Sequence, residues 1–177
     1  MNIFQLSEKT CPVEAASFHC SKHVVKMLLE VNQILCDAFI VNGIEAPYKK
    51  CNPNHPSTKW ARQTYQNFQW TLSLGFALSN EYHKSYGKSH KCDDVLVWIR
   101  DNAHRINLPN NGLTTHAVAI PADAVCRSRF INFDQKPVWE QYRLYYVFDK
   151  PFAKWDKLNN TPQWFLDMRQ KYANVLA

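Results

Sequence analysis

Glycine is scarce in this chain, with 4 among 177 residues. A glycine-rich phosphate-binding loop and a turn-dense β-sandwich both depend on glycine, so neither is expected. Long apolar runs are also missing, since none reaches the roughly 18 residues of a membrane-spanning helix. The opening sequence, MNIFQLSEKT, lacks the basic start and the apolar core of a signal peptide. We therefore expect a globular cytoplasmic protein without a membrane partner.

Paired cysteines are absent as well. The 6 cysteines are scattered, no Cys-x-x-Cys pair occurs, and without a secretion signal they are expected to be reduced thiols. His19 and His23 could share a metal ion on one helical face, but no Glu follows His19 and no Glu-x-x-His pair occurs in the chain. We therefore expect neither a metal nor another cofactor.

Hydrophobic and aromatic residues are plentiful, at 46% and 14% of the chain, which is typical of a globular protein. The length suits one domain with a substantial core, and no repeat or linker divides it, so we predict a single domain over residues 1–177. The formal net charge of +6 favours an anionic partner, either nucleic acid or a nucleotide. The sequence does not predict an oligomeric state.

Apolar periodicity and helix-capping residues predict a mostly α fold. Five helices are expected, at residues 18–43, 58–86, 93–106, 137–149 and from Thr161 onward. Ser57 is a suitable N-cap for the second helix, and Gly75 within it predicts close packing against another backbone. Residues 1–6 are expected to form a short strand, and residues 108–121 a loop. The predicted fold is a single-domain helical bundle with a short N-terminal strand and long irregular loops.

A line of polar residues runs along the first long helix, whose other side chains are mostly apolar. Its members, at intervals of four, three, four and three residues, are His19, His23, Lys26, Glu30 and Gln33. This spacing stacks side chains on one helical face. Such a stripe is usually the solvated face of a surface helix, but this one is narrow, and we favour a seam that lines an internal pocket or cleft. Lys26 and Glu30 can act as a nucleophile beside a general acid or base, or form an ordinary helical ion pair.

Further candidates for substrate binding lie elsewhere. The end of the second helix and its exit carry Glu81, Tyr86, Lys88 and His90, which suit an anion site or simple helix capping. Basic and aromatic residues are also interleaved along the chain, a pattern that suits phosphate contacts and stacking on bases. The alternative is that the aromatic residues belong to the core and the lysines to the surface. From this pattern we select Trp60, Arg143 and Tyr146.

Several segments resemble known proteins. The stretches MNIF, SKHVVKMLLEVNQIL, NHPSTKW and EYHKSYGKSH resemble a widespread set of phage proteins of largely unassigned role. The pattern formed by Lys26, Glu30 and the Gln-Ile-Leu run at Gln33, followed by Asn-His-Pro and Trp60, is also similar to bacterial proteins grouped with the pyrimidine dimer DNA glycosylases. These segments cover about half of the chain.

The resemblance to the glycosylases implies a compact, mostly helical fold and cleavage of an N-glycosidic bond. It implies that Glu30 is the essential carboxylate, which stabilises the sugar cation or relays protons. The phage glycosylase of this group uses an α-amine that removal of the initiator methionine exposes. Here the bulky Asn2 is expected to keep Met1 in place, which leaves Lys26 as the seam amine that could replace the terminal one.

We therefore predict a phage-type protein that acts on nucleic acid or a nucleotide. It would be a glycosylase-like hydrolase with Glu30 as acid/base and with Lys26 and His23 beside it. The expected substrate-binding residues are His19, Gln33, Trp60, Glu81, Tyr86, Lys88, His90, Arg143 and Tyr146. The alternative is a non-catalytic phage protein that sequesters a nucleotide or inhibits a host defence. Either would work in the cytoplasm, which is that of the host cell if the protein is phage-encoded.

Overall fold

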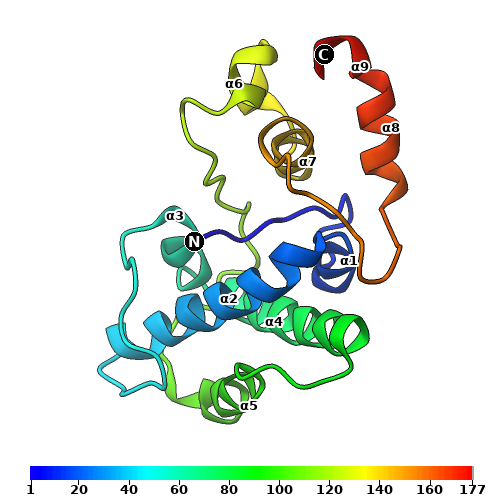
Figure 1. The fold of residues 1–177 in the computed structure, drawn as a ribbon. Helices are drawn as coiled ribbons and strands as arrows, with labels where there is room; N and C mark the ends of the chain where they lie inside the picture. Colours follow the sequence, from blue (N-terminus) through cyan, green and yellow to red (C-terminus); the bar gives the residue numbers. More distant parts are fainter. Residues whose placement is uncertain (177) are drawn as a thin grey trace.

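The computed structural model describes residues 1–176, and every regular element within this range is a helix (Figure 1). The predicted mostly α fold is therefore confirmed. The strand predicted over residues 1–6 is wrong, because this segment is extended but lies against side chains rather than against another strand. The Asn2 N–H donates to Glu30, and the Leu6 carbonyl accepts from Arg143. Side chains from helices thus satisfy backbone groups that a sheet would otherwise pair. Residue 177 of the predicted domain lies outside the described range.

The α-helices, in chain order, are α1 (Pro12–Ser17), α2 (Ser21–Val41), α3 (Pro56–Ala61), α4 (Tyr65–Tyr86), α5 (Asp93–Asn102), α6 (Val125–Arg129), α7 (Val138–Asp149), α8 (Gln163–Lys171) and α9 (Ala173–Leu176). Two 3₁₀ turns, Ala103–Arg105 and Phe133–Gln135, lie in the later loops. Most of the remaining chain between α5 and α6 is irregular, as predicted for residues 108–121.

The helix predicted over residues 58–86 is in fact two helices, α3 and α4. The chain leaves α3 at Arg62, whose guanidinium pairs with the fully buried Asp37 of α2. Thr64 then caps α4, because its hydroxyl accepts from the backbone N–H of Asn67 at 3.1 Å. The N-cap of α3 is His55, which replaces the predicted Ser57. Tertiary contacts therefore break a stretch that has a continuous helical pattern.

The core centres on α2 and α4, which pack against each other, with α1 on α4 and α5 on both (Figure 1). Gly75 of α4 faces a close neighbour, as predicted, although the neighbour is a pair of side chains rather than a backbone. A Cβ at this position would lie 2.7 Å from Leu96 Cδ2 and 3.1 Å from Val31 Cγ1. The missing side chain thus allows α2, α4 and α5 to meet.

A second group of helices is formed by α7, which packs against α6 and α8. In Figure 1 the extended N-terminal segment runs between this group and the group that contains α2 and α4. Residues from both groups contact it, including Glu30 of α2 and Tyr142 of α7. The first residues of the chain therefore lie where the two groups of helices meet.

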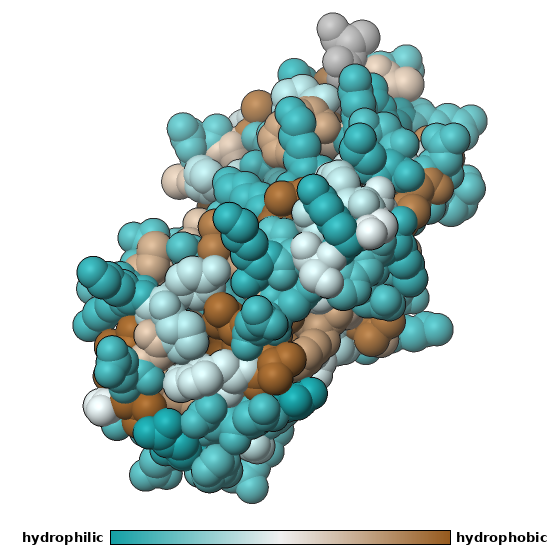
Figure 2. All heavy atoms as spheres, turned by 60° about the horizontal axis from the view of Figure 1, so that its bottom comes forward, coloured by the Kyte–Doolittle hydropathy of each residue, from teal (hydrophilic) through white to brown (hydrophobic). Residues whose placement is uncertain are grey.

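The surface facing the reader in Figure 2 is mostly hydrophilic, and its apolar residues form separate small groups. Among the helices of residues 1–176, none is both long and apolar enough to cross a membrane.

Candidate functional site

A cleft of about 500 Å³ opens beside the N-terminal segment. Its walls come from that segment, the N-terminal half of α2, the loop before α3, the chain around Ala119 and the turn after α7. Three residues of the predicted polar seam line it, namely His23, Lys26 and Glu30. The helical spacing seen in the sequence thus brings this part of the seam to one cavity.

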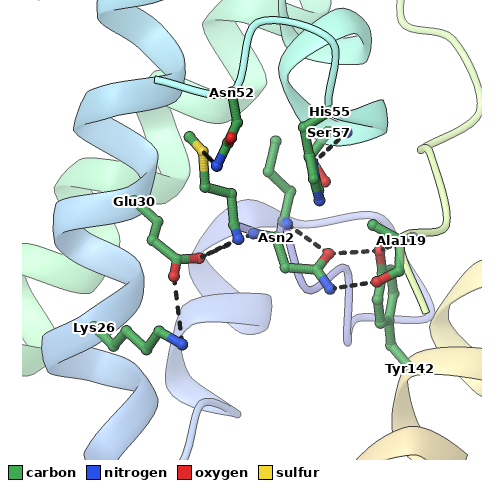
Figure 3. Close-up of polar contacts among 10 residues, drawn as sticks. Asn2, Lys26, Glu30, Asn52, His55, Ser57, Ala119 and Tyr142 are labelled. Carbon is green, nitrogen blue, oxygen red and sulfur yellow. Dashed lines mark hydrogen bonds and ion pairs between the residues drawn. The ribbon is translucent and has the colours of Figure 1, made fainter. Parts of the chain in front are cut away.

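Glu30 is the centre of a compact polar cluster (Figure 3). Its residue is 8% exposed, and its Oε2 accepts a hydrogen bond of 2.9 Å from the backbone N–H of Asn2. The same oxygen lies 3.7 Å from the amino nitrogen of Met1, and Oε1 lies 3.5 Å from Lys26 Nζ. A carboxylate this deeply placed needs such partners, because burial without them is costly. Glu30 is thus held between two primary amines.

The side chain of Asn2 fixes the first residues in this position (Figure 3). Its Nδ2 donates to the Ala119 carbonyl at 3.0 Å, and its Oδ1 accepts from Tyr142 Oη at 2.8 Å and from the Ile3 N–H at 2.8 Å. The Tyr142 hydroxyl also accepts from the backbone N–H of Ala119 at 3.0 Å. Desolvation by burial raises the pKa of Tyr142 above its ordinary value, so the hydroxyl keeps its proton as a donor. Asn2 therefore joins the N-terminal segment to α7 and to the loop around Ala119.

His23 is a neutral wall of the cleft. Burial lowers its pKa to about 3, and the nearby charges of His19, Lys150 and Lys26 act in the same direction. Its Nδ1 lies 2.5 Å from Tyr146 Oη, and burial raises the pKa of this tyrosine well above 10. The tyrosine therefore donates, and the ring proton of His23 is on Nε2. The Phe4 ring stacks on the His23 ring at 4.8 Å between ring centres.

His55 enters the cleft from the loop before α3 (Figure 3). Its Nδ1 accepts the backbone N–H of Ser57 at 3.2 Å, so a neutral ring carries its proton on Nε2. Burial lowers the pKa of His55, and the amino group of Met1 lowers it further, whereas Glu30 opposes the shift. His55 is thus a neutral hydrogen-bond donor near the Glu30 cluster.

The other predicted seam residues lie outside this cleft. His19 is buried beneath it, bonds the Ala15 carbonyl through Nδ1 at 2.7 Å, and has a pKa lowered by burial to about 4. Gln33 is half-buried one turn beyond Glu30 and does not line the cleft. Tyr146, which was predicted from the basic and aromatic pattern, is fully buried and contacts the cleft residues His23 and Phe4 from behind.

Two more predicted binding residues have structural partners. Trp60 is buried and stacks on His116 at 4.1 Å between ring centres. Arg143 donates to the Leu6 carbonyl at 3.0 Å and to Glu8 at 2.7 Å, and its guanidinium lies over the Trp139 ring. Arg143 therefore secures the N-terminal segment from the side away from the cleft.

The candidates at the end of α4 form a separate group. Glu81 pairs with Lys84 at 2.8 Å, and Tyr86 packs against Tyr82 at 4.6 Å between ring centres. Lys88 is exposed, and His90 accepts the Cys92 N–H at the start of α5. None of the four lines the Glu30 cleft, so the structure does not bring them to it.

The cleft also contains residues that the sequence did not single out as site residues. They are Met1, Asn2, Phe4, Lys22, Met27, His55, Ala119, Pro121, Tyr145, Lys150 and Phe152. Lys22 could have been found, because it continues the four-residue spacing of Lys26 and Glu30 along α2. The others, apart from Met27 of α2, come from the N-terminal segment, from loops, and from α7 and the turn after it, which are far from α2 in the sequence, so no local spacing signals their approach.

Within residues 1–176, no three His, Cys, Asp or Glu side chains are grouped so that they could hold a metal ion. All six cysteines are free thiols. The groups that line the cleft are amines, an amide, aromatic rings and, among the described residues, one carboxylate. Such groups suit an organic or phosphorylated ligand rather than a metal ion.

Comparison of the chain with known protein families, with curated proteins and with solved structures finds no match.

Proposed function

We propose that this protein cleaves the N-glycosidic bond of a nucleotide unit, in nucleic acid or in a free nucleotide, with Glu30 as the acid/base. The observation that supports this most is the position of Glu30, a buried carboxylate between the amino group of Met1 and Lys26. A carboxylate beside an amine is the arrangement that nucleophilic catalysis at an electrophilic carbon needs.

The proposed reaction is a substitution at C1′ of the sugar. The amine first loses its ammonium proton to solvent. The neutral amine then attacks C1′, the C1′–N bond breaks, and its electron pair leaves with the base, which takes a proton from solvent. Glu30 stabilises the positive charge on the sugar, accepts one proton from the attached nitrogen and returns it to the ring oxygen as the ring opens to an imine. Water then hydrolyses the imine, which restores the amine and leaves an abasic sugar.

Two amines are available for the attack. The Met1 nitrogen lies in a half-buried residue whose neighbour Asn2 is fixed by three side-chain hydrogen bonds. The Lys26 side chain is 67% exposed and can move. Fixed geometry at the reacting atom favours the Met1 amine over the predicted Lys26, since effective molarity depends on orientation.

The charge of the cleft supports a phosphorylated substrate. Lys22, Lys26 and Lys150 line it, whereas Glu30 is the one carboxylate that residues 1–176 contribute to it. Phe4, Tyr145 and Phe152 supply apolar ring surface in the same cavity. Cations beside aromatic rings are typical of sites that hold a nucleotide.

The decisive variant is Glu30→Gln, assayed by mass spectrometry of products from undamaged and ultraviolet-damaged duplex DNA and from a panel of nucleotides. We expect loss of base release by a factor of about 100 or more, because both proton transfer and charge stabilisation are removed. The matched control is Glu140→Gln, which changes a half-buried glutamate outside the cleft that pairs with Lys136 at the same four-residue spacing. Base release by folded Glu30→Gln at the rate of the unsubstituted protein would refute the proposal.

The attacking amine can be identified by reduction. Borohydride added during turnover should join the sugar covalently to the protein, and peptide mapping would show the adduct on the residue that carries the α-amine or on Lys26. Base release without any adduct would show that water attacks C1′ directly and that Glu30 serves as its general base.

The alternative is a non-catalytic protein that sequesters a nucleotide in the same cleft, and the cations and rings there would serve it equally well. Such a protein returns the ligand intact after long incubation, so recovery of a free base excludes it. A protein that inhibits a host defence through protein contacts alone would bind no nucleic acid even at low salt.

A further inference from the structure

The cleft has a second end, two helical turns along α2 from Glu30, where basic and aromatic side chains meet. Lys22 Nζ lies 5.3 Å from the centre of the Phe152 ring, and Lys150 Nζ lies 5.9 Å from the same centre. Lys150 Nζ is also 3.9 Å from the centre of the Tyr145 ring. All four residues line the cleft, so two ammonium groups converge on one ring inside it.

No carboxylate neutralises these two ammonium groups. Across the described part of the chain, neither Lys22 nor Lys150 takes part in an ion pair. Asp149 is next to Lys150 in the sequence, but it accepts backbone N–H groups of α6 at 2.6 and 3.0 Å. Glu30 is occupied by Lys26 and the N-terminus. Two positive charges thus lie close together, and a bound anion would offset the repulsion between them.

We propose that Lys22 and Lys150 form a phosphate-binding subsite, with the rings of Phe152 and Tyr145 as its walls. Lysine ammonium groups bind phosphate oxygens as point charges, and an aromatic wall beside them accepts a sugar or a base by stacking. The inference deepens the proposed function and rests on it, because it names the part of the substrate that is held away from Glu30.

The position of this subsite limits where the phosphate can come from. Lys22 and Glu30 are eight residues apart on α2, which corresponds to about 12 Å along the helix axis. A phosphate held there belongs to the neighbouring unit of a nucleic-acid strand, or to the far end of the phosphate chain of a free nucleoside triphosphate. Phosphate is common to both sources, and the competition experiment below distinguishes them.

Binding is measured in the Glu30→Gln background, where the proposed cleavage is blocked. The probe is a fluorescein-labelled DNA strand that carries a tetrahydrofuran abasic analogue, followed by anisotropy at several salt concentrations. The added double substitution K22Q/K150Q should weaken binding at least tenfold at low salt. It should also reduce the slope of log K against log salt by about 1 for each lysine removed.

The matched control is K91Q/K171Q, which removes the same charge from two exposed lysines outside the cleft. Its binding should stay within about twofold of the parent protein at the same salt concentration, apart from a small effect of net charge. The charge-conserving pair K22R/K150R should restore most of the lost affinity. Thermal unfolding of each variant identifies any loss that comes from misfolding.

Competition with thymidine triphosphate and with thymidine identifies the source of the phosphate. Lysine-dependent competition by the triphosphate but not by thymidine supports a free nucleotide, whereas strand binding that neither displaces supports a phosphodiester. Equal competition by thymidine and its triphosphate overturns the subsite, as does K22Q/K150Q binding no more weakly than the control pair.

Cleavage assays on the unsubstituted protein and on K22Q/K150Q, which both keep Glu30, test the subsite and the proposed function separately. If binding depends on the two lysines and no protein releases a base, the subsite stands and the glycosylase proposal fails. If base release occurs with a KM that K22Q/K150Q does not change, the glycosylase proposal stands and the subsite is refuted.

Discussion

Two of the three partners of the Glu30 carboxylate are backbone groups at the start of the chain. Its hydrogen bond from Asn2 N–H and its approach to the Met1 nitrogen both depend on where the first two residues lie. That position is set by the Asn2 side chain, which Tyr142 and the Ala119 carbonyl hold. The Met1 nitrogen beside Glu30 is therefore positioned by a single asparagine.

Tyr142→Phe should test this dependence. The substitution removes one hydroxyl that bonds both Asn2 Oδ1 and the Ala119 N–H, and leaves these buried groups without that partner. We expect a loss of about 1–3 kcal/mol in the free energy of unfolding, together with slower base release. Urea denaturation and cleavage kinetics measure the two effects.

The control for Tyr142→Phe is Tyr172→Phe, because the Tyr172 hydroxyl makes no hydrogen bond within residues 1–176 and lies outside the cleft. Destabilised Tyr142→Phe with an unchanged cleavage rate would show that Asn2 stabilises the fold without positioning the amine.

At the scale of elements, local patterns predicted that the main helices exist better than they predicted the residues at which the helices begin and end. Apolar residues all round α2, and a proline before α7, identify these helices because the information lies within each segment. The break between α3 and α4 was not predictable in this way. It depends on Arg62 meeting Asp37, and on Thr64, whose hydroxyl also donates to the Gly112 carbonyl. Both contacts come from distant parts of the chain.

The candidate site also combines residues that a local pattern predicts with residues that only the tertiary fold brings together. The spacing of His23, Lys26 and Glu30 on one helix indicated a polar face that the structure places in a cleft. Asn2 and Phe152 reach that cleft from segments about 150 residues apart in the sequence, so only the tertiary fold brings them together. Arg143 and Trp60 have the residue types of a nucleotide site, but the structure uses them in packing.

Gly75→Ala tests the contact of α4 with α2 and α5. Alanine favours a helix over glycine by about 1 kcal/mol, but the new Cβ would lie 2.7 Å from Leu96 and 3.1 Å from Val31. Overpacking costs about 1–3 kcal/mol, so we expect a net loss of up to about 2 kcal/mol in chemical denaturation. Asn80→Ala, at an exposed position of α4, should not destabilise. Recovery of stability in G75A/L96V would assign the loss to Leu96, whereas a gain in G75A alone would contradict the packing argument.

At the scale of the whole molecule, three buried histidines make stability depend on pH. Burial lowers the pKa of His19 to about 4 and the pKa values of His23 and His116 to about 3. In the unfolded chain a histidine has a pKa of about 6.5. Each histidine therefore binds a proton in the unfolded chain at a pH where it stays neutral in the folded one.

The direction of the effect follows from proton linkage. Above pH 6.5 these histidines are neutral in both states, so their contribution to stability is complete. As the pH falls from about 6.5 toward their folded pKa values, the unfolded chain binds more protons, and each histidine lowers the free energy of unfolding by up to about 1.4 kcal/mol per pH unit.

Urea denaturation between pH 6.5 and pH 5 measures this slope above the range where most carboxylates titrate. His116→Phe keeps a ring between Trp60 and Trp70. It removes one of the three groups that bind a proton only in the unfolded chain, so it should lower the slope by up to about 1.4 kcal/mol per pH unit. His104→Gln, at an exposed position, should not change the slope. An equal slope in His116→Phe and the unsubstituted protein would mean that His116 can be protonated within the fold, and acid stability would then have to be set by other groups.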